Sequence, residues 1–496
     1  MESVASQSRS LNLAKSLNQA FGEAAREAPL CVDLDGTLVR GDTLLECLLL
    51  LIKQQPACLL LLPLWLMRGK AYFKNEVAAR VRFDAAAMPY RAELVDWLRG
   101  EAARGRRLVL ASGANVRIVE AVAAHLGIFS DTLASDEVQN LTGEAKTAAL
   151  AARFGRFDYI GDATVDLPVW RTAEKAYLCA SSAIRARAFG QQVTFARTFC
   201  DEPVSSLRLW LRALRLHQWV KNVLMFVPIV LAHEFMDFDR LGTLMLGFMA
   251  FNICASSVYV LNDLLDLAAD RQHPRKSSRP FASGDLPLIN GIAIWPVLVV
   301  SGFALAVYAS PAFAGVLCIY YVLTLAYSFD LKRRALVDVF ALASLYTLRI
   351  IAGAVAAAVA LSPWLLGFSI FIFLSLAIVK RVAELHSVRE RGIRDVVGRG
   401  YQIDDLAILE VLGVAAGYAS VVVLALYVSA PESRMLYQYH QLLWLFAPLV
   451  LFWISRVWLI THRGEMHDDP IVFAMKDAPS RIVGLVAILV LEFAAL

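Results

Sequence analysis

Two carboxylates near the start of the chain have the spacing of a nucleophile and its proton donor. In PLCVDLDGTLVRGDT (29–43), an apolar strand ends at Asp33, and Gly36 permits a sharp turn directly after Asp35. A carboxylate at a strand end can attack a phosphoryl group, and a second one can move a proton to the leaving oxygen. The stretch therefore predicts phosphoryl transfer, with Asp33 as nucleophile and Asp35 as acid or base.

Three later stretches supply the other groups that this reaction needs. A strand in RRLVLASGAN (106–115) ends at Ser112, whose hydroxyl can hold phosphate oxygens, and LTGEAKTAAL (141–150) supplies Lys146 as a neutralising cation. In FDYIGDATVDLPVW (157–170), a further strand ends at Asp162 and Asp166. Carboxylate oxygens are hard ligands that suit Mg²⁺. We therefore expect a magnesium site with ligands among Asp33, Asp35, Asp162 and Asp166.

These four motifs resemble those of the haloacid dehalogenase-like phosphatases. The resemblance implies an α/β Rossmann-like fold with a helical cap, and a phospho-aspartyl intermediate on Asp33. The alternative is a degenerate domain that serves only as a scaffold. We predict a polar N-terminal extension at 1–28 and a phosphatase domain at 29–200, with its cap at about 43–90.

The start of the predicted cap is unusually apolar. In TLLECLLLLIKQQPACLLLLPLWLMRGKAYFK (43–74), the apolar runs are too short to span a bilayer and are broken by Lys53, Pro56 and Pro63. The segment suits a helical hairpin in the headgroup region, which would let the phosphatase take a lipid phosphate. A cap helix that packs on its own domain explains the pattern equally well.

The C-terminal part of the chain is predicted to be an all-α transmembrane bundle over 217–496. The whole chain is 58% hydrophobic, and from about Leu216 onward apolar segments of roughly 18 to 23 residues recur, the length that crosses a hydrocarbon core. A basic amphipathic linker at 201–220 precedes them. We predict nine spans, near 217–235, 241–262, 289–309, 311–329, 336–358, 362–382, 407–429, 440–461 and 482–496.

Charge and cysteine content indicate the membrane orientation, the redox state of the thiols and the class of partner. Lys and Arg collect in alternate loops, so the positive-inside rule places those loops and the N-terminal domain in the cytoplasm of a multi-pass inner or plasma membrane protein. The N-terminus lacks the pattern of a secretory signal. The seven cysteines contain no CxxC pair, which favours reduced thiols. A net charge of +4, with basic residues at the membrane face, favours acidic lipids or phosphates over nucleic acid as partners.

Both signs of charge gather where the second predicted span ends, in NDLLDLAADRQHPRKSSRP (262–280). If the helix continues, four acidic or amide side chains share one face. They would repel one another without a cation, so their clustering favours a bound Mg²⁺. These residues are Asn262, Asp263, Asp266 and Asp270. The metal would hold a pyrophosphate group that departs from carbon, with Asp263 and Asp266 in the catalytic role. Direct phosphate contacts are predicted for Arg271, Lys276 and Arg279.

The segment from about residue 210 to the end resembles the UbiA superfamily of intramembrane prenyltransferases. Many relatives carry a second acidic cluster, but LAYSFDLKRRALVDVF (325–340) is basic instead. Arginine inside a span is costly and is usually functional, which singles out Arg349, although an internally paired cation remains an alternative. We predict phosphate contacts for Lys221, Lys332, Arg349 and Lys380.

Several stretches are similar to the polyprenyl-phosphate phosphoribosyltransferase branch of this superfamily. That resemblance implies attack of a polyprenyl phosphate on phosphoribosyl pyrophosphate, followed by removal of the sugar 5-phosphate by the phosphatase. The alternatives are an aromatic prenyltransferase that joins a polyprenyl diphosphate to a 4-hydroxybenzoate-like acceptor, and a membrane-tethered phosphatase whose bundle only binds lipid. The loop that contains His467, Asp468 and Asp469 either approaches the cavity or merely connects two spans.

Overall fold

The computed structural model describes residues 27–179, 193–199, 205–390, 400–466 and 469–495. These residues form two compact units. One comprises Met1–Leu214 with Val260–Ile294, and the other comprises Arg215–Tyr259 with Trp295–Leu496. Most of the predicted extension at 1–28, the start of the predicted linker at 201–204, and the pair His467 and Asp468 lie outside the described residues.

The first unit is built on a parallel sheet with the strand order β3-β2-β1-β4-β5-β6. The strands are β1 (Leu30–Val32), β2 (Leu108–Asn115), β3 (Asp131–Ser135), β4 (Asp158–Gly161), β5 (Ala176–Leu178) and β6 (Phe195–Thr198). The order runs outward on both sides of β1, as in doubly wound folds, where ligands bind beyond the carboxyl ends of the strands. The predicted Rossmann-like domain is therefore confirmed.

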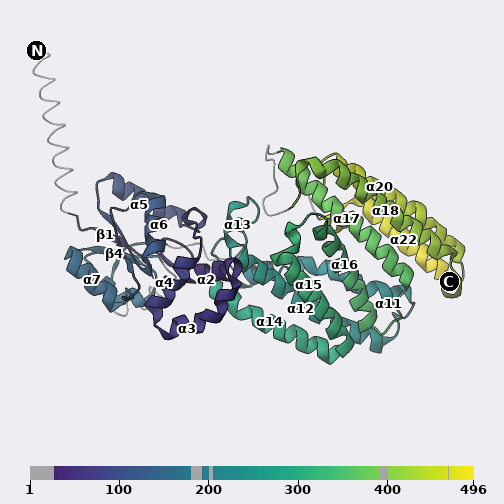
Figure 1. Cartoon of the computed structure of the whole chain (residues 1–496), viewed down its shortest axis with the longest axis horizontal. Helices are drawn as coiled ribbons and strands as arrows, with labels where there is room; N and C mark the ends of the chain where they lie inside the picture. Colours follow the sequence, from purple (N-terminus) through teal and green to yellow (C-terminus); the bar gives the residue numbers. More distant parts are fainter. Residues whose placement is uncertain (1–26, 180–192, 200–204, 391–399, 467–468, 496) are drawn as a thin grey trace, which may run out of the picture. The chain divides into compact units, whose positions relative to one another are not determined.

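Alternate residues of the strands enter two separate apolar cores, because successive side chains point to opposite faces of a sheet. Leu30 and Val32 belong to one core and Cys31 to the other. Helices α5 (Ala92–Ala103) and α6 (Val116–Leu126) contribute to the first core, and α7 (Glu144–Phe154) and α8 (Leu167–Thr172) to the second. The helices flank the sheet on its two faces (Figure 1).

The cap follows β1 as a series of short helices: α2 (Thr43–Gln54), η1 (Pro56–Leu61), α3 (Leu62–Met67) and α4 (Lys70–Arg80). Asp42 caps α2 by accepting a hydrogen bond from the backbone N–H of Leu45, and Gly69 breaks the path between α3 and α4 at a φ of 108°. The buried side chains of Leu51, Trp65 and Val77 join the first core. The cap therefore packs on its own domain, while other apolar residues of η1 and α3 stay exposed.

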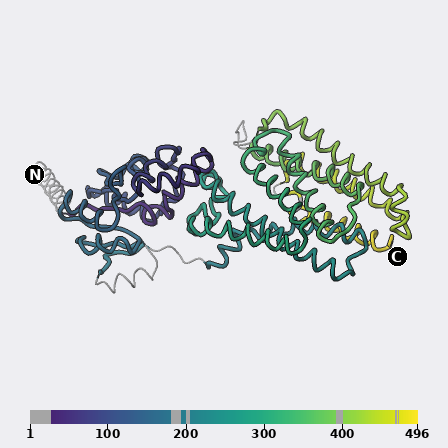
Figure 2. Tube along the Cα trace, turned by 60° about the horizontal axis from the view of Figure 1, so that its bottom comes forward, coloured from purple at the N-terminus to yellow at the C-terminus, as the bar shows by residue number. Residues whose placement is uncertain are grey.

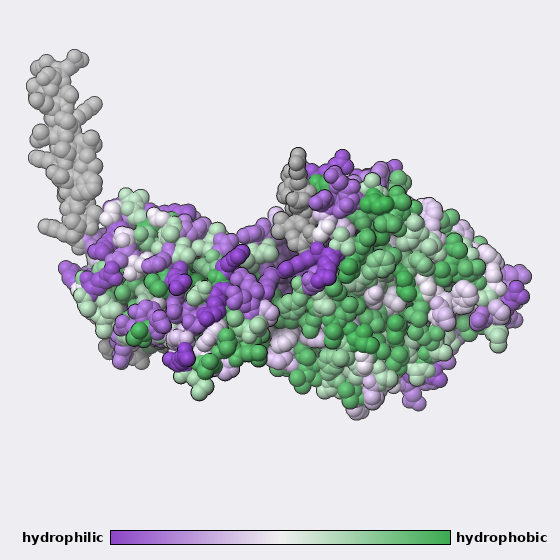
Figure 3. Space-filling view, viewed as in Figure 1, coloured by the Kyte–Doolittle hydropathy of each residue, from purple (hydrophilic) through white to green (hydrophobic). Residues whose placement is uncertain are grey.

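Eight helices of the described residues are long and apolar enough to cross a membrane. They are Phe238–Leu265 (α12), Leu288–Ala309 (α14), Pro311–Phe329 (α15), Val337–Ala356 (α16), Pro363–Glu390 (α17), Ile403–Ser429 (η6 and α18), His440–His462 (η7 and α20) and Ala478–Ala495 (α22). Apolar side chains dominate the visible surface over these helices (Figure 3). The helical membrane domain is thus confirmed, and the protein is an integral membrane protein.

The segment predicted as the first span, 217–235, differs from the expectation. It forms a 3₁₀ helix, η4 (Leu216–Phe226), followed by the short helix α11 (Val227–Leu231), and together they are shorter than each of the eight candidate spans. Arg215 starts the segment with a left-handed φ of 52°, which separates it from the amphipathic helix α10 (Ser206–Ala213) of the predicted linker. Apolar composition alone did not reveal this break.

Close packing fixes η4 against the bundle of the second unit. Successive helices α16, α17 and α18 pack side by side (Figure 2), and α16 also packs on η4. At their contact lies Gly353, where any Cβ atom would collide with the backbone carbonyl of Met225. The absence of a side chain at Gly353 therefore permits the close approach of η4.

Candidate active sites

The strand ends of the first unit bring three carboxylates together. Asp33 follows β1, and Asp162 and Asp166 follow β4; one carboxylate oxygen from each lies within 4.8 Å of the others. Among the described residues, these three side chains have the spacing of metal ligands. Three hard oxygen donors at this separation fit a Mg²⁺ ion. Asp35, also predicted as a ligand, does not belong to the group.

Lys146 lies at the centre of the same cluster. Its ammonium group is 3.1 Å from Asp33 Oδ1 and 3.5 Å from Asp166 Oδ1, and it donates a hydrogen bond to the Tyr159 hydroxyl at 2.9 Å. Tyr159 in turn donates to Asp166 at 2.9 Å. This geometry is compatible with the predicted role of Lys146 as a neutralising cation. The hydrogen bonds of Tyr159 to Lys146 and Asp166 were not predicted, because a tyrosine in a strand suggests only packing.

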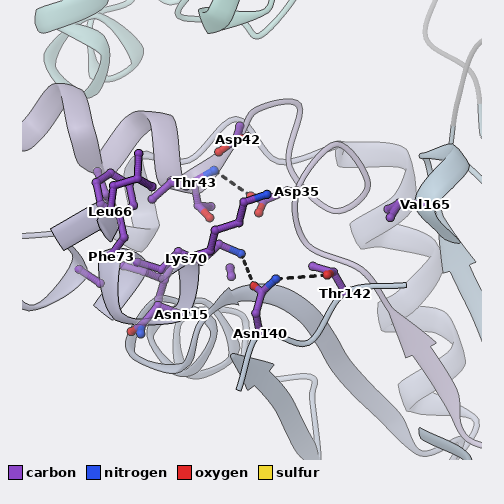
Figure 4. A pocket seen from close by; sticks show the side chains of 16 residues that line it. Asp35, Asp42, Thr43, Leu66, Lys70, Phe73, Asn115, Asn140, Thr142 and Val165 are labelled. Carbon is purple, nitrogen blue, oxygen red and sulfur yellow. Dashed lines mark hydrogen bonds between the residues drawn. The ribbon is translucent and has the colours of Figure 1, made fainter. Parts of the chain in front are cut away.

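Asp35 faces the cap side instead of the carboxylate group. Its Oδ1 accepts a hydrogen bond from the backbone N–H of Thr43 at 2.8 Å, and it lines a cavity of about 450 Å³. Figure 4 shows Leu66 and Phe73 of the cap on one side of this cavity and Asp35 toward the strand ends. The cavity thus lies between the cap helices and the carboxyl ends of the strands.

Burial shifts the acidity of both carboxylates. It raises the pKa of Asp35 to about 7, with a further contribution from the charge of Asp42, and it raises the pKa of Asp33 to about 6 against the opposing effect of Lys146. An acid that titrates near neutral pH can both give and take a proton. The raised pKa of Asp35 is compatible with the predicted acid or base role, which stays a prediction.

Ser112 is fully buried within β2, which continues to Asn115 and does not end at Ser112 as predicted; its hydroxyl accepts a hydrogen bond from the backbone N–H of Ala114 at 3.1 Å. Next to it, Lys74 of α4 donates to the Gly113 carbonyl at 2.7 Å and to Asn140 Oδ1 at 2.8 Å, and both side chains line the cavity. Sequence reasoning missed Lys74 and Asn140, because they are far from Ser112 along the chain and carry no motif of their own.

The aspartate-rich segment belongs to the first unit, and its helix is interrupted within the segment. Helix α12 stops at Leu265, and α13 (Leu267–Gln272) follows after Asp266. The backbone N–H groups of Asp266 and Asp270 still donate hydrogen bonds to the carbonyls of Asn262 and Asp266, so the helical spacing of these residues is largely kept. The carboxylates nevertheless do not all point toward the same position.

Two of the four predicted ligands converge. The buried Asp263 and Asp270 both contact Arg279 Nη1, at 3.1 and 2.6 Å. Their oxygens therefore surround a position that accepts a positive charge, which is the property a Mg²⁺ site requires. The part-buried Asp266 instead pairs with Lys53 of α2 at 2.7 Å, and Asn262 is half-buried. Arg271, predicted to bind phosphate, pairs with Glu46 of α2 at 2.8 Å, while Lys276 is exposed.

In the second unit, the predicted phosphate contacts form two neighbouring polar clusters. Lys221 of η4 and Lys380 of α17 both approach Asp469 Oδ2, at 2.8 and 3.5 Å. Arg349 of α16 donates to Asn222 Oδ1 at 2.7 Å and to the Tyr320 hydroxyl at 3.2 Å. Because Lys221 and Asn222 are adjacent in η4, the two clusters meet there. Asp469, whose loop was expected either to approach the cavity or merely to connect two spans, contacts both of these lysines.

Lys332 and Arg381 are two further cations of the second unit. Lys332 is half-buried in η5 (Leu331–Arg333). Arg381 is almost fully buried and binds Asp338 at 2.7 Å, the Tyr327 hydroxyl at 3.0 Å, and Glu384. Sequence reasoning missed this buried network, since Tyr327, Asp338 and Arg381 lie on three different helices.

Two family matches agree with this geometry. Residues 223–476 match the UbiA prenyltransferase family, and residues 30–171 match the haloacid dehalogenase-like hydrolases. The uncharacterized protein y4nM of Sinorhizobium fredii is 38% identical over 463 residues, which cover 92% of this chain and 89% of y4nM.

The chain belongs to the UbiA prenyltransferase family.

This UbiA-family enzyme thus also carries a hydrolase-like domain at its N-terminus. The nodulation protein NoeC of Azorhizobium caulinodans is 37% identical over 274 residues, which cover 54% of this chain and 88% of NoeC. Decaprenyl-phosphate phosphoribosyltransferase of Mycobacterium tuberculosis is 38% identical over 185 residues, which cover 36% of this chain and 61% of that enzyme. Both matched families are generally dependent on divalent metals.

Proposed function

We propose that this UbiA-family enzyme joins a polyprenyl phosphate to phosphoribosyl pyrophosphate and that its phosphatase domain then removes the 5-phosphate from the lipid-linked sugar. The transferase assignment rests chiefly on the cationic cluster of Lys221 and Lys380, which offers binding for a second phosphate besides a metal-held pyrophosphate. The similarity to decaprenyl-phosphate phosphoribosyltransferases supports the same substrate pair.

In the transfer step, a phosphate oxygen of the lipid attacks the anomeric carbon, and the bond from that carbon to pyrophosphate breaks. Asp263 and Asp270 are the residues that would hold Mg²⁺, with Asp266 and Asn262 beside them; the metal would neutralise the departing pyrophosphate. Lys221, Lys380 and Arg349 would orient the lipid phosphate, and Arg279, Arg271, Lys276 and Lys332 lie in the loops that would contact the diphosphate substrate. The acceptor side of the reaction thus relies on this chain's cations.

In the phosphatase step, Asp33 attacks the phosphorus of the 5-phosphate and the sugar oxygen departs with a proton from Asp35. Water then hydrolyses the phospho-aspartate, with Asp35 as base. Lys146 and Ser112 would hold the phosphoryl oxygens, and Mg²⁺ held by Asp33, Asp162 and Asp166 would reduce the repulsion between nucleophile and phosphate. Loss of the 5-phosphate makes the preceding transfer irreversible.

We further propose the phosphatase domain at 29–200 and the transferase domain at 217–496, with both active sites on the cytoplasmic side. This sidedness follows from the Lys and Arg content of alternate loops.

Product analysis tests the proposal directly. Purified full-length protein would receive Mg²⁺, decaprenyl phosphate and phosphoribosyl pyrophosphate, and its lipids would be examined by mass spectrometry. We expect lipid-linked ribose without a 5-phosphate, and phosphorylated lipid-linked ribose from the Asp33→Asn variant. A prenylated ring from a polyprenyl diphosphate and 4-hydroxybenzoate, with no product from phosphoribosyl pyrophosphate, would instead identify an aromatic prenyltransferase.

A further inference from the structure

The cap of the phosphatase exposes a continuous run of large apolar side chains. Leu60 of η1 and Met67 of α3 are 86% and 85% exposed, and their neighbours are exposed as well: Leu59, Leu61, Leu64 and Leu66. Single exposed apolar residues are normal on soluble proteins, but a contiguous patch marks an interaction surface. Elsewhere between Pro29 and Leu178, the described large apolar residues with comparable exposure are the isolated Val138 and Val165. We name Leu59–Met67 the cap patch.

The fold holds the cap patch outward. Trp65, in the middle of the patch, points the other way and is buried in the core of the domain, where the guanidinium of Arg80 lies 4.6 Å from its ring centre. The partly buried Leu62 packs against the same core. Since the inner side of α3 is anchored in this way, the leucines and Met67 on its outer side cannot turn inward without displacing Trp65.

The charges around the cap patch are of one sign. Arg68 and Lys70 follow it directly and are exposed, and no acidic residue occurs between Pro56 and Asn75. An apolar surface with a basic border is the combination found in segments that lie at an anionic membrane interface. A partner protein would not require that combination, whereas acidic lipid headgroups match it.

The cap patch also borders the catalytic cavity. Leu66 is half exposed in the patch and lines the cavity together with Lys70, Phe73 and Asp35. An apolar substrate tail can therefore contact the cap while its phosphate reaches the catalytic carboxylates. The domain is attached to a chain with eight candidate membrane spans, so a lipid surface is always within its reach.

We propose that the cap patch, with Arg68 and Lys70, docks on an anionic lipid bilayer and presents the phosphatase cavity to phosphate monoesters carried by membrane lipids. The docking deepens the proposed function, because it rests on the phosphatase step at Asp33 and names the surface on which that step takes place.

Photocrosslinking of the full-length protein in vesicles tests the docking itself. Benzoylphenylalanine would be placed at Leu60, at Met67, or at Val138 as an equally exposed control in the same domain. We expect lipid adducts at the first two positions, at least five-fold above the control, in vesicles that contain phosphatidylglycerol, and fewer adducts in phosphatidylcholine alone. Equal yields at all three positions, or adducts only with protein, would overturn the proposal; equal yields in both kinds of vesicle would remove its anionic part.

Kinetics of a Leu60→Asp, Met67→Asp double variant tests the consequence. We expect removal of the 5-phosphate from the lipid-linked sugar in vesicles to fall at least ten-fold, while hydrolysis of soluble p-nitrophenyl phosphate stays within two-fold of the unmodified protein. The Val138→Asp variant should change neither rate. Unchanged turnover of the lipid substrate would refute the role of docking. Absence of both activities in the unmodified protein would refute the phosphatase step, and the crosslinking result would still decide the docking.

Discussion

The ammonium group of Lys146 lies 3.1 Å from a carboxylate oxygen of Asp33, and both side chains are buried. In this position the lysine can hold the nucleophile and a phosphoryl oxygen at once. We expect Lys146→Met to lower p-nitrophenyl phosphate hydrolysis by about 10²- to 10³-fold, the usual effect of removing a group that stabilises developing charge. Lipid-linked product from the transferase should still form. The exposed Lys175 provides the control, since Lys175→Met should leave hydrolysis unchanged.

Asp35→Asn should affect phosphate esters according to their leaving group. A sugar alkoxide needs a proton as it departs, whereas p-nitrophenolate is stable without one, so only the first reaction needs the acid. We expect 5-phosphate removal to fall by about 10²- to 10⁴-fold and phosphorylation of the enzyme by p-nitrophenyl phosphate to fall much less. Single-turnover release of p-nitrophenol measures the latter. Equal losses for both esters would exclude Asp35 as the general acid.

Arg279 neutralises two buried carboxylates, Asp263 and Asp270. The Arg279→Gln variant leaves these buried carboxylates without that positive partner. The free energy of unfolding, measured in the presence of a chelator, should therefore fall by about 1–3 kcal/mol. If both carboxylates are metal ligands, added Mg²⁺ should restore thermal stability in the variant more than in the unmodified protein. Differential scanning fluorimetry in detergent measures both effects. A deficit that Mg²⁺ leaves unchanged would argue against a metal at this position.

Lys221 provides a test of the cationic cluster. Loss of a charge-assisted hydrogen bond to a phosphate weakens binding by about 1.5–3 kcal/mol, so Lys221→Met should raise the KM for polyprenyl phosphate roughly ten- to a hundred-fold. The KM for phosphoribosyl pyrophosphate should change much less. Arg481→Gln, an exposed change outside the cluster, serves as the control. If both KM values rose equally, Lys221 would not distinguish the two substrates.

The phosphatase centre could largely be predicted from sequence because parallel strands end at one edge of the sheet. Asp33, Asp162 and Asp166 follow two adjacent strands, β1 and β4, so their convergence required only the strand pattern. The position of Asp35 toward the cap could not be predicted in this way, since it depends on the turn at Gly36 and on the N-terminus of α2. Lys74 and Asn140 meet only through tertiary packing.

Apolar segment length predicted eight of the nine expected spans correctly, but it did not predict the local breaks in the helices. Hydropathy does not distinguish a 3₁₀ helix from an α-helix, so η4 was predicted as part of a span. Likewise, the shared face of Asn262, Asp266 and Asp270 was conditional on one continuous helix, whereas Asp266 takes a non-helical conformation between α12 and α13. Ion pairs such as Arg381 with Asp338 join distant helices, and no local pattern reports them.

Gly353 gives the membrane domain a dependence on one missing side chain. It lies one helical turn after Arg349 on α16, and Met225, against which it packs, lies one turn after Lys221 and Asn222 in η4. Any bulk at residue 353 would push η4 away and lengthen the hydrogen bond from Arg349 to Asn222. The absence of a side chain at residue 353 therefore sets the distance between Arg349 and Asn222. A substitution at this position would alter substrate affinity without touching a charged group.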